Sequence, residues 1–150
     1  MLFRIINLIT DKFKILEPGT EVFTGKSNLS SNGPTERVVW YLENDSYGPS
    51  HNLGQNPKQA FSRDALVSFC LFAGSPERID SLINSMAVAI KWIMNEDGLE
   101  LSGEMIDLGV EAVNGFGYKL DAVISTVIAE PMYPVGIVKS EVITTQFQIT

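Results

Sequence analysis

The sequence predicts an α+β domain of two layers, with an antiparallel or mixed sheet of about four strands and two helices packed on one face. Three observations predict it: an amphipathic helix pattern at the N-terminus, an apolar strand leading into a second amphipathic helix, and an alternating strand at the C-terminus. A chain of 150 residues, 45% of them hydrophobic and 19% charged, is long enough to bury a core. We therefore expect one globular domain spanning residues 1–150.

The first predicted element is a helix over Leu2–Leu16. Its apolar residues recur at helical spacing, and Pro18 and Gly19 end the pattern. The β-branched and aromatic bias of its first half leaves a strand open as the alternative there. The apolar stripe consists of Leu2, Ile5, Ile6, Ile9, Phe13 and Leu16.

A short strand over Glu21–Thr24 and a clear strand over Arg37–Glu43 follow. The second of these alternates, with Val38, Trp40 and Leu42 on one face. Between the two strands, Gly25–Glu36 is polar and rich in turn residues, which predicts a loop.

A long connection over Asn44–Gln59 contains several Gly and Pro residues. A loop of this length is uncommon in a compact domain unless it has a function. It carries Tyr47 and His51, so we expect it to project and to contact neighbouring subunits or partners.

The centre of the chain is a strand over Ala65–Phe72 followed by a long helix. Apolar residues occupy both faces of the strand, which is typical of an inner strand. Ser75 is placed to cap the helix, and Pro76 and Glu77 suit its first turn. An apolar stripe then continues from Ile79 to Met94.

The chain after this helix is harder to interpret. Gly98 suits a C-terminal cap, but the apolar residues of Leu99–Leu120 have no convincing period. Asn114–Gly117 is expected to be a turn, and the β-branched run Asp121–Ile128 predicts a strand.

The last predicted strand is Glu141–Ile149, where apolar and polar residues alternate. Exposed strand edges are hazardous in a monomer but useful where subunits extend a sheet into their neighbours. We expect subunit contacts through this strand, and we expect Gln146→Pro to block assembly. Its outward polar row is Thr144, Gln146 and Gln148, and the inward row is Ile143, Thr145, Phe147 and Ile149.

The formal net charge of −7 argues against a protein that grips nucleic acid by its phosphates. An acidic run without Lys or Arg is either a solvated surface or a surface that repels polyanions or meets a basic partner. This run consists of Glu96, Asp97, Glu100, Glu104, Asp107 and Glu111.

The sequence shows no recognisable arrangement of catalytic residues. His51 is the single histidine and lies in a Gly/Pro-rich segment, which does not suit a hydrolase triad. One histidine and one cysteine, Cys70, do not make a zinc site, and no glycine-rich phosphate loop occurs. We expect no catalytic, metal-binding or cofactor-binding residues, and no enzyme. Trp40 and Trp92 are expected in the core or at its rim rather than as ligand platforms.

Targeting signals are also not expected. No apolar stretch approaches the length of a membrane span, and the apolar N-terminus has no small-residue cleavage site. Cys70 lies in the apolar central strand, so we expect an inert core thiol and an intracellular site of assembly.

The order of elements resembles that of the tail-terminator, or tail-completion, proteins of long-tailed bacteriophages. The resemblance rests on the N-terminal helix Leu2–Leu16, the strand Arg37–Leu42, the unit from Ala65–Phe72 to Ile79–Met94, and the last strand ending Thr145–Ile149. It covers most of the chain and is one of pattern, without a diagnostic motif. The loops at residues 25–36 and 44–59 are longer than such a minimal domain needs.

The resemblance implies a structural virion protein without cofactors, assembled in the host cytoplasm as a homo-hexameric ring. Such a ring caps the tail tube, ends its polymerisation and meets the head-side connector, while genomic DNA passes through without sequence-specific binding. The acidic run would then line the lumen, where charge reversal should slow DNA passage but leave the ring intact. One alternative is a neck adaptor of the same particle. Another is a small-molecule-binding or enzymatic α+β domain with a pocket beneath Trp92.

Overall fold

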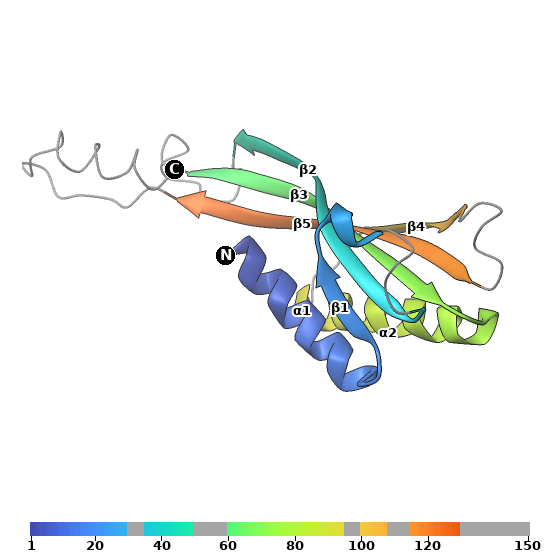
Figure 1. Ribbon diagram of the computed structural model, residues 1–150. Helices are drawn as coiled ribbons and strands as arrows, with labels where there is room; N and C mark the ends of the chain where they lie inside the picture. The colour runs from blue at the N-terminus through green and yellow to red at the C-terminus, as the bar shows by residue number, and fades with distance from the viewer. Residues whose placement is uncertain (30–34, 50–59, 95–99, 108–114, 130–150) are drawn as a thin grey trace, which may run out of the picture. The chain divides into compact units, whose positions relative to one another are not determined.

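The structure is a computed structural model that describes residues 1–29, 35–49, 60–94, 100–107 and 115–129. The expected strand Glu141–Ile149 and the expected cap at Gly98 lie outside these residues. The described elements form an α+β fold with two α-helices and one five-stranded mixed sheet, so the predicted fold class is confirmed (Figure 1). The helices are α1 (Leu2–Leu16) and α2 (Pro76–Met94), and a 3₁₀ turn, η1, covers Lys26–Leu29. The strands are β1 (Glu21–Thr24), β2 (Arg37–Pro49), β3 (Ala60–Ala73), β4 (Leu101–Ile106) and β5 (Phe116–Ala129).

The strand order in the sheet is β1-β2-β3-β5-β4. Strand β1 runs parallel to β2, with Glu21 opposite Arg37, and β4 runs antiparallel to β5, with Leu101 opposite Ala122. The central position of β3 confirms that the apolar strand is an inner one. Between β3 and β5, Ser68 contacts Asp121 and Asp64 contacts Ser125, so residue numbers rise on one strand as they fall on the other.

The chain divides into two compact units. Unit 1 comprises Met1–Ser46 and Asp64–Ser125, which include both α-helices, β1 and β4; unit 2 comprises Tyr47–Arg63 and Thr126–Thr150. Strands β2, β3 and β5 contribute residues to both units. Within the described part of unit 2, Ser62 Oγ donates to the carbonyl oxygen of Gly48 over 3.3 Å.

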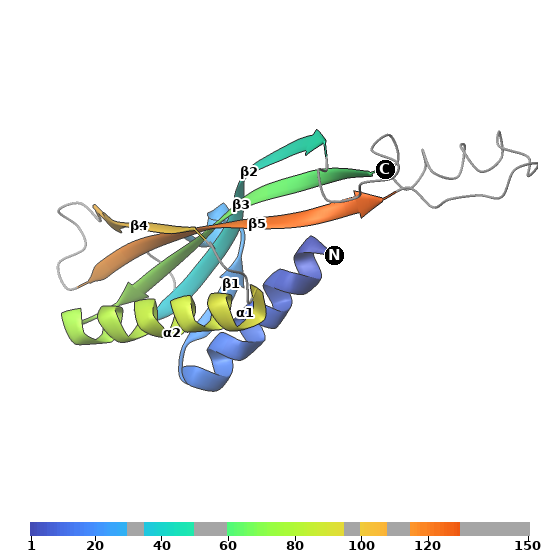
Figure 2. The same cartoon turned by 180° about the vertical axis from the view of Figure 1, so that it is seen from behind.

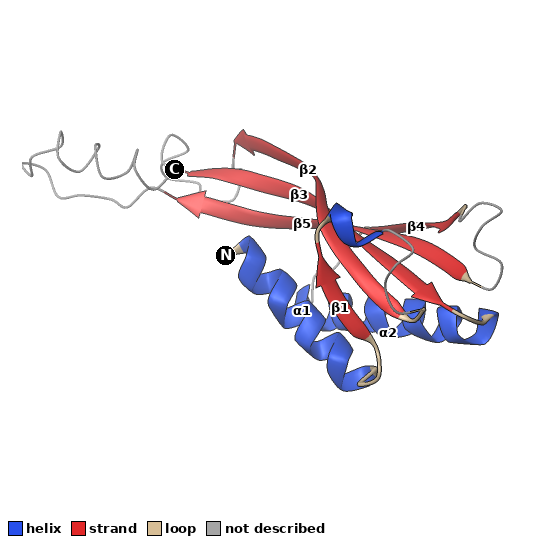
Figure 3. Ribbon diagram, viewed as in Figure 1, coloured by secondary structure: helices blue, strands red, loops and turns tan. Residues whose placement is uncertain are grey.

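The main core of unit 1 lies between the two helices and one face of the sheet (Figures 2 and 3). α1 begins and ends where its sequence predicts, and it buries the predicted stripe except for the rim residues Ile5 and Leu16. α2 starts with the predicted cap, because Ser75 Oγ accepts a hydrogen bond from the backbone N–H of Arg78 over 3.2 Å. The largest fully buried side chains of this core are Leu2, Ile6, Ile9, Phe13, Val38, Phe69, Leu71, Leu82, Met86, Ile90 and Ile124.

Several sequence predictions were wrong in extent. Strand β2 continues to Pro49, through polar residues that were expected to begin the connection Asn44–Gln59. Ser46 Oγ donates to the carbonyl oxygen of Asp64 over 3.3 Å, and strand β3 begins at Ala60, before the expected start. Cross-strand pairing outweighs the turn-forming composition of this segment, because β propensity depends on the neighbouring strand.

Other corrections concern shorter segments. The expected loop Gly25–Glu36 contains η1, and Gly25 adopts φ 99°, a left-handed conformation that favours glycine. The expected turn Asn114–Gly117 is already strand at Phe116 and Gly117. Strand β4 was not predicted at all and makes the sheet five-stranded.

Candidate functional surface

The two faces of the sheet differ in what covers them. One carries both helices, whereas the other carries a small apolar cluster of Val39, Cys70 and Phe72, with Leu29 of η1 packed against it. Arg37 stacks its guanidinium 4.2 Å from the centroid of the Phe72 ring and donates from Nη2 to the carbonyl oxygen of Leu29. Burial lowers the pKa of Arg37, and burial raises the pKa of the Cys70 thiol, which is therefore inert.

Beside this cluster the same face carries several charged side chains. We call this region the helix-free face and define it by Glu43, Asp64, Glu104, Lys119 and Asp121. Lys119 Nζ lies 3.8 Å from a Glu43 oxygen and 3.7 Å from an Asp121 oxygen. Glu104 of β4 stands opposite Lys119, so it shares the same side of the sheet. Three carboxylates, those of Glu43, Glu104 and Asp121, thus lie beside one lysine, and this part of the face is locally negative.

Two of these carboxylates are fixed across strands. Asp121 accepts a 2.6 Å hydrogen bond from Ser68, and Asp64 accepts a 2.7 Å bond from Ser125. Strands β3 and β5 thereby hold the charges in place on a rigid element, rather than on a loop.

Strand β4 forms one edge of the described sheet, and five of its six residues are exposed. Leu101 and Met105 lie on the helix side, since Leu101 is opposite the core residue Ala122, yet the helical layer leaves Met105 57% exposed. Ser102 and Glu104 lie on the helix-free side. β4 therefore presents two uncovered side-chain rows and one backbone edge without a partner strand in the described sheet.

The middle of β4 is shaped by a glycine. A Cβ added to Gly103 would collide with the Tyr118 ring and hydroxyl. Tyr118, which packs against the main core, therefore lies over Gly103, where the missing side chain leaves room for its ring.

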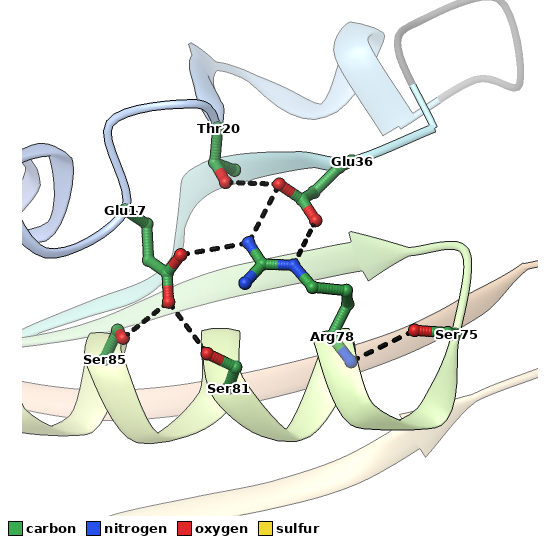
Figure 4. Close-up of polar contacts among 7 residues, drawn as sticks. All are labelled: Glu17, Thr20, Glu36, Ser75, Arg78, Ser81 and Ser85. Carbon is green, nitrogen blue, oxygen red and sulfur yellow. Dashed lines mark hydrogen bonds and ion pairs between the residues drawn. The ribbon is translucent and has the colours of Figure 1, made fainter.

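A cluster of ion pairs joins α1, β2 and α2 (Figure 4). Arg78 Nε lies 2.7 Å from Glu36 Oε1, and its Nη2 lies 2.9 Å from Glu17 Oε2. Glu17, just after α1, also accepts 2.9 Å hydrogen bonds from Ser81 and Ser85 on α2.

The chemistry of this cluster is structural. Burial raises the pKa of Glu17, but hydrogen bonds from Arg78, Ser85 and Ser81 outweigh it and hold the pKa below the ordinary value of 4.5. Glu36 is shifted in the same direction, chiefly by its bond to Arg78. Carboxylates that stay ionised and are already hydrogen-bonded are poor proton acceptors, so the cluster fastens the helices rather than moving protons.

The residues predicted from sequence fall in different places. Tyr47 lies in β2, is exposed, and has the Arg63 guanidinium 5.8 Å from its ring centroid. The other predicted interface residues, His51, Thr144, Gln146 and Gln148, are outside the described residues. Of the acidic run, Glu100, Glu104 and Asp107 are exposed in or beside β4, while Glu96, Asp97 and Glu111 lie outside the described residues.

Trp40 is buried as predicted, but Trp92 is 67% exposed and belongs to neither the core nor its rim. The Lys12 ammonium lies 4.5 Å from the centroid of the Trp92 ring, across the contact between α1 and α2. Trp92 is exposed because it lies off the buried stripe of α2, which contains Met86, Ala89 and Ile90.

The helix-free face was missed from sequence. Its carboxylates come from β2, β3, β4 and β5, and they approach one another only through the strand order. Side chains alternate along a strand, so Glu43 and Asp121 point to the opposite face from their neighbours Leu42 and Leu120. This alternation is the one sequence signal that could have identified the carboxylates of the helix-free face.

Among the described residues, no group of three or more His, Cys, Asp or Glu side chains could hold a metal ion. Neither α1 nor α2 combines the length and apolar character needed to cross a membrane.

Comparison with known protein families finds no family model that matches this chain. Comparison with curated proteins likewise finds no match.

Proposed function

We propose that this chain is a non-enzymatic structural protein of a long-tailed phage virion, which caps the tail tube as a homo-hexameric ring. In this role it ends tube polymerisation and joins the tail to the head-side connector. The observation that carries the proposal is the β4 edge, a strand exposed on both faces at the end of the described sheet.

An uncovered edge strand favours assembly for a physical reason. The outer backbone edge of β4 has no partner strand in the described sheet, and Leu101 and Met105 are exposed, so this strand favours pairing with another chain. Folded monomers usually protect such edges. Lys and Pro, which commonly block an edge, do not occur in Leu101–Ile106. Self-assembly into a closed ring would satisfy the edge of every subunit at once.

The carboxylates support passage of DNA through such a ring. A surface of like charge keeps phosphates from adhering, so an acidic lumen favours sliding over binding. Glu100, Glu104 and Asp107 were expected to line the lumen, and the proposal now adds Glu43 and Asp121 of the helix-free face to that lining.

The experiment is mass by light scattering after gel filtration, followed by negative-stain imaging. A ring of about six subunits with a central channel is expected. As a matched pair, Gln146→Pro should abolish the ring and Gln146→Ala should preserve it, because proline removes one backbone donor whereas alanine removes none. A monodisperse monomer over a hundredfold range of concentration would contradict the proposal.

A second measurement concerns the lumen. The double variant Glu104→Lys/Asp107→Lys should still form rings but slow the exit of DNA from assembled particles. The alternative role, a neck adaptor, uses the same ring with different neighbours. Binding of the purified ring to tube protein supports the terminator, and binding to the connector alone supports the adaptor.

A further inference from the structure

The exposed edge of β4 could accept a further strand, and this chain contains a segment of suitable sequence. We propose that the segment Glu141–Ile149 of a neighbouring copy adds as a strand to the outer edge of β4. This inference rests on the proposed function, because it supplies the contact that repeats around the ring.

The two edge strands of the described sheet, β1 and β4, differ in how well their side chains are covered. In β1, at the other edge, Val22 packs against the main core and Phe23 against the small apolar cluster of the opposite face. In β4, the rows on both sides are exposed apart from the partly buried Ile106. An added strand would therefore bury side-chain surface at β4 and little at β1.

As a strand, the segment would have side-chain rows that match those of β4. Neighbouring strands place like-facing residues beside one another, so two rows must fit simultaneously. The apolar row containing Ile143 and Phe147 suits Leu101 and Met105 on the helix side. The polar row containing Gln146 then meets Ser102 and Glu104, where amide groups can donate to the carboxylate.

The length also fits. Glu141–Ile149 has nine residues, enough to pair with all six of β4. Main-chain hydrogen bonds would supply affinity, and the two rows would supply register, as in recognition by strand addition.

Symmetry selects this occupant over pairing of β4 with β4. An antiparallel pair of two β4 strands, with Leu101 beside Met105 of the other copy, is chemically acceptable but is isologous and stops at a dimer. A segment of one copy on the edge of the next is heterologous, and it closes into a ring when the rotation allows.

Disulfide trapping tests the contact directly. Native Cys70 is buried, so it should not compete with an added surface cysteine for disulfide formation. Ser102→Cys protein is mixed with Thr144→Cys, Gln146→Cys or Gln148→Cys protein, each prepared separately, and the mixture is oxidised. The three variants step along the polar row, so one should bring its Cα within about 7 Å of residue 102 and cross-link in high yield.

Thr145→Cys is the matched control, since its side chain belongs to the opposite row and should cross-link to Ser102→Cys at least tenfold less. A bond that forms only when both cysteines are in one chain would place the segment on its own β4 and overturn the inference. Cross-linking of Ser102→Cys protein with Glu104→Cys protein, as abundant as in the mixtures, would overturn it in favour of β4 pairing with β4, because the antiparallel pair places these two positions side by side.

Light scattering on the same samples separates the two proposals. Rings without any cross-link from the three mixtures would leave the proposed function standing and overturn the strand addition. Absence of both rings and cross-links would overturn both.

Discussion

Replacing Arg78 by Met removes the guanidinium that joins Glu17, after α1, and Glu36, before β2, to the start of α2. Met keeps much of the side-chain length and packing, so the change isolates the charge and its hydrogen bonds. Glu17, 8% exposed, would retain only the hydroxyls of Ser81 and Ser85, and Glu36 would retain only Thr20.

The magnitude follows from the bonds lost and their exposure. Arg78 donates three hydrogen bonds to carboxylates, at 2.7, 2.9 and 3.0 Å. Hydrogen bonds to charged groups contribute about 1.5–3 kcal/mol each, which sets an upper limit of roughly 4.5–9 kcal/mol. Because the Arg78 side chain is 42% exposed and that of Glu36 is 28% exposed, water replaces much of this. We expect a loss of about 2–3 kcal/mol, most of it from stranding the buried Glu17.

The assay is urea unfolding at pH 7, monitored by circular dichroism. A loss of about 2–3 kcal/mol corresponds to a fall of roughly 4–12 °C in Tm for a chain of this size. Arg78→Lys should fall between wild type and Arg78→Met, because lysine keeps the charge but not the fork that binds two carboxylates. Asp80→Asn, on the exposed side of the same helix, is the matched control and should change stability by less than about 0.5 kcal/mol.

The pH dependence gives a second check. The folded-state pKa values of Glu17 and Glu36 are lowered, so their contribution is present above the ordinary pKa of 4.5 and is lost as pH falls through the folded values. The stability gap between wild type and Arg78→Met should therefore shrink as pH falls below about 4.5. A gap that stays constant to pH 3, or a loss at pH 7 no larger than that of Asp80→Asn, would refute this explanation of the cluster.

Three further predictions concern single sites. Trp40→Ala should cost about 3–5 kcal/mol and Trp92→Ala less than about 1 kcal/mol, measured by urea unfolding, because one ring is buried and the other is mostly in water. Gly103→Ala should cost about 1–3 kcal/mol through its collision with Tyr118, and the same change in a Tyr118→Ala background should cost much less; equal costs would contradict the close approach. The Cys70 thiol should resist a thiol reagent at pH 8 in the folded protein and react promptly in urea, and rapid reaction of the native chain would contradict its burial.

The helices were predictable because the residues of each helix alone specify it. The stripe of α1 and the cap of α2 are local patterns, and the bounds of α1 agree with the structure to the residue. The same applies to β3, whose apolar residues on both faces specify an inner position regardless of which strands flank it.

β4 was missed for the opposite reason. Periodicity reports burial, and a strand exposed on both faces has no buried row to mark it. The extension of β2 through Ser46 and Tyr47 is similar, because pairing with β3 decides it and the composition alone favours a turn. Sequence reasoning thus failed where the partner strand, rather than the segment itself, determines the structure.

The helix-free face shows the same limit at the level of function. The acidic run was visible as a cluster in sequence, but Glu104 meets Lys119 and its neighbours Glu43 and Asp121 only through the pairing of separate strands. The charge pattern along the chain therefore identified part of the surface, and the strand order supplied the remainder.

Strand addition at β4, if repeated around a ring, would also decide which face of the sheet lines the channel. It would continue the sheet from one subunit to the next, so each side of the sheet would become one side of the whole ring. The helices of the main core form a layer about 10 Å thick on one side only. When a layered band closes into a ring, the outer layer has the longer circumference, and bulky helices need that extra width in every subunit. In the proposed ring the helices would therefore lie outside. The helix-free face, with Glu43, Glu104 and Asp121, would line the channel, where an acidic wall would let DNA pass without holding it.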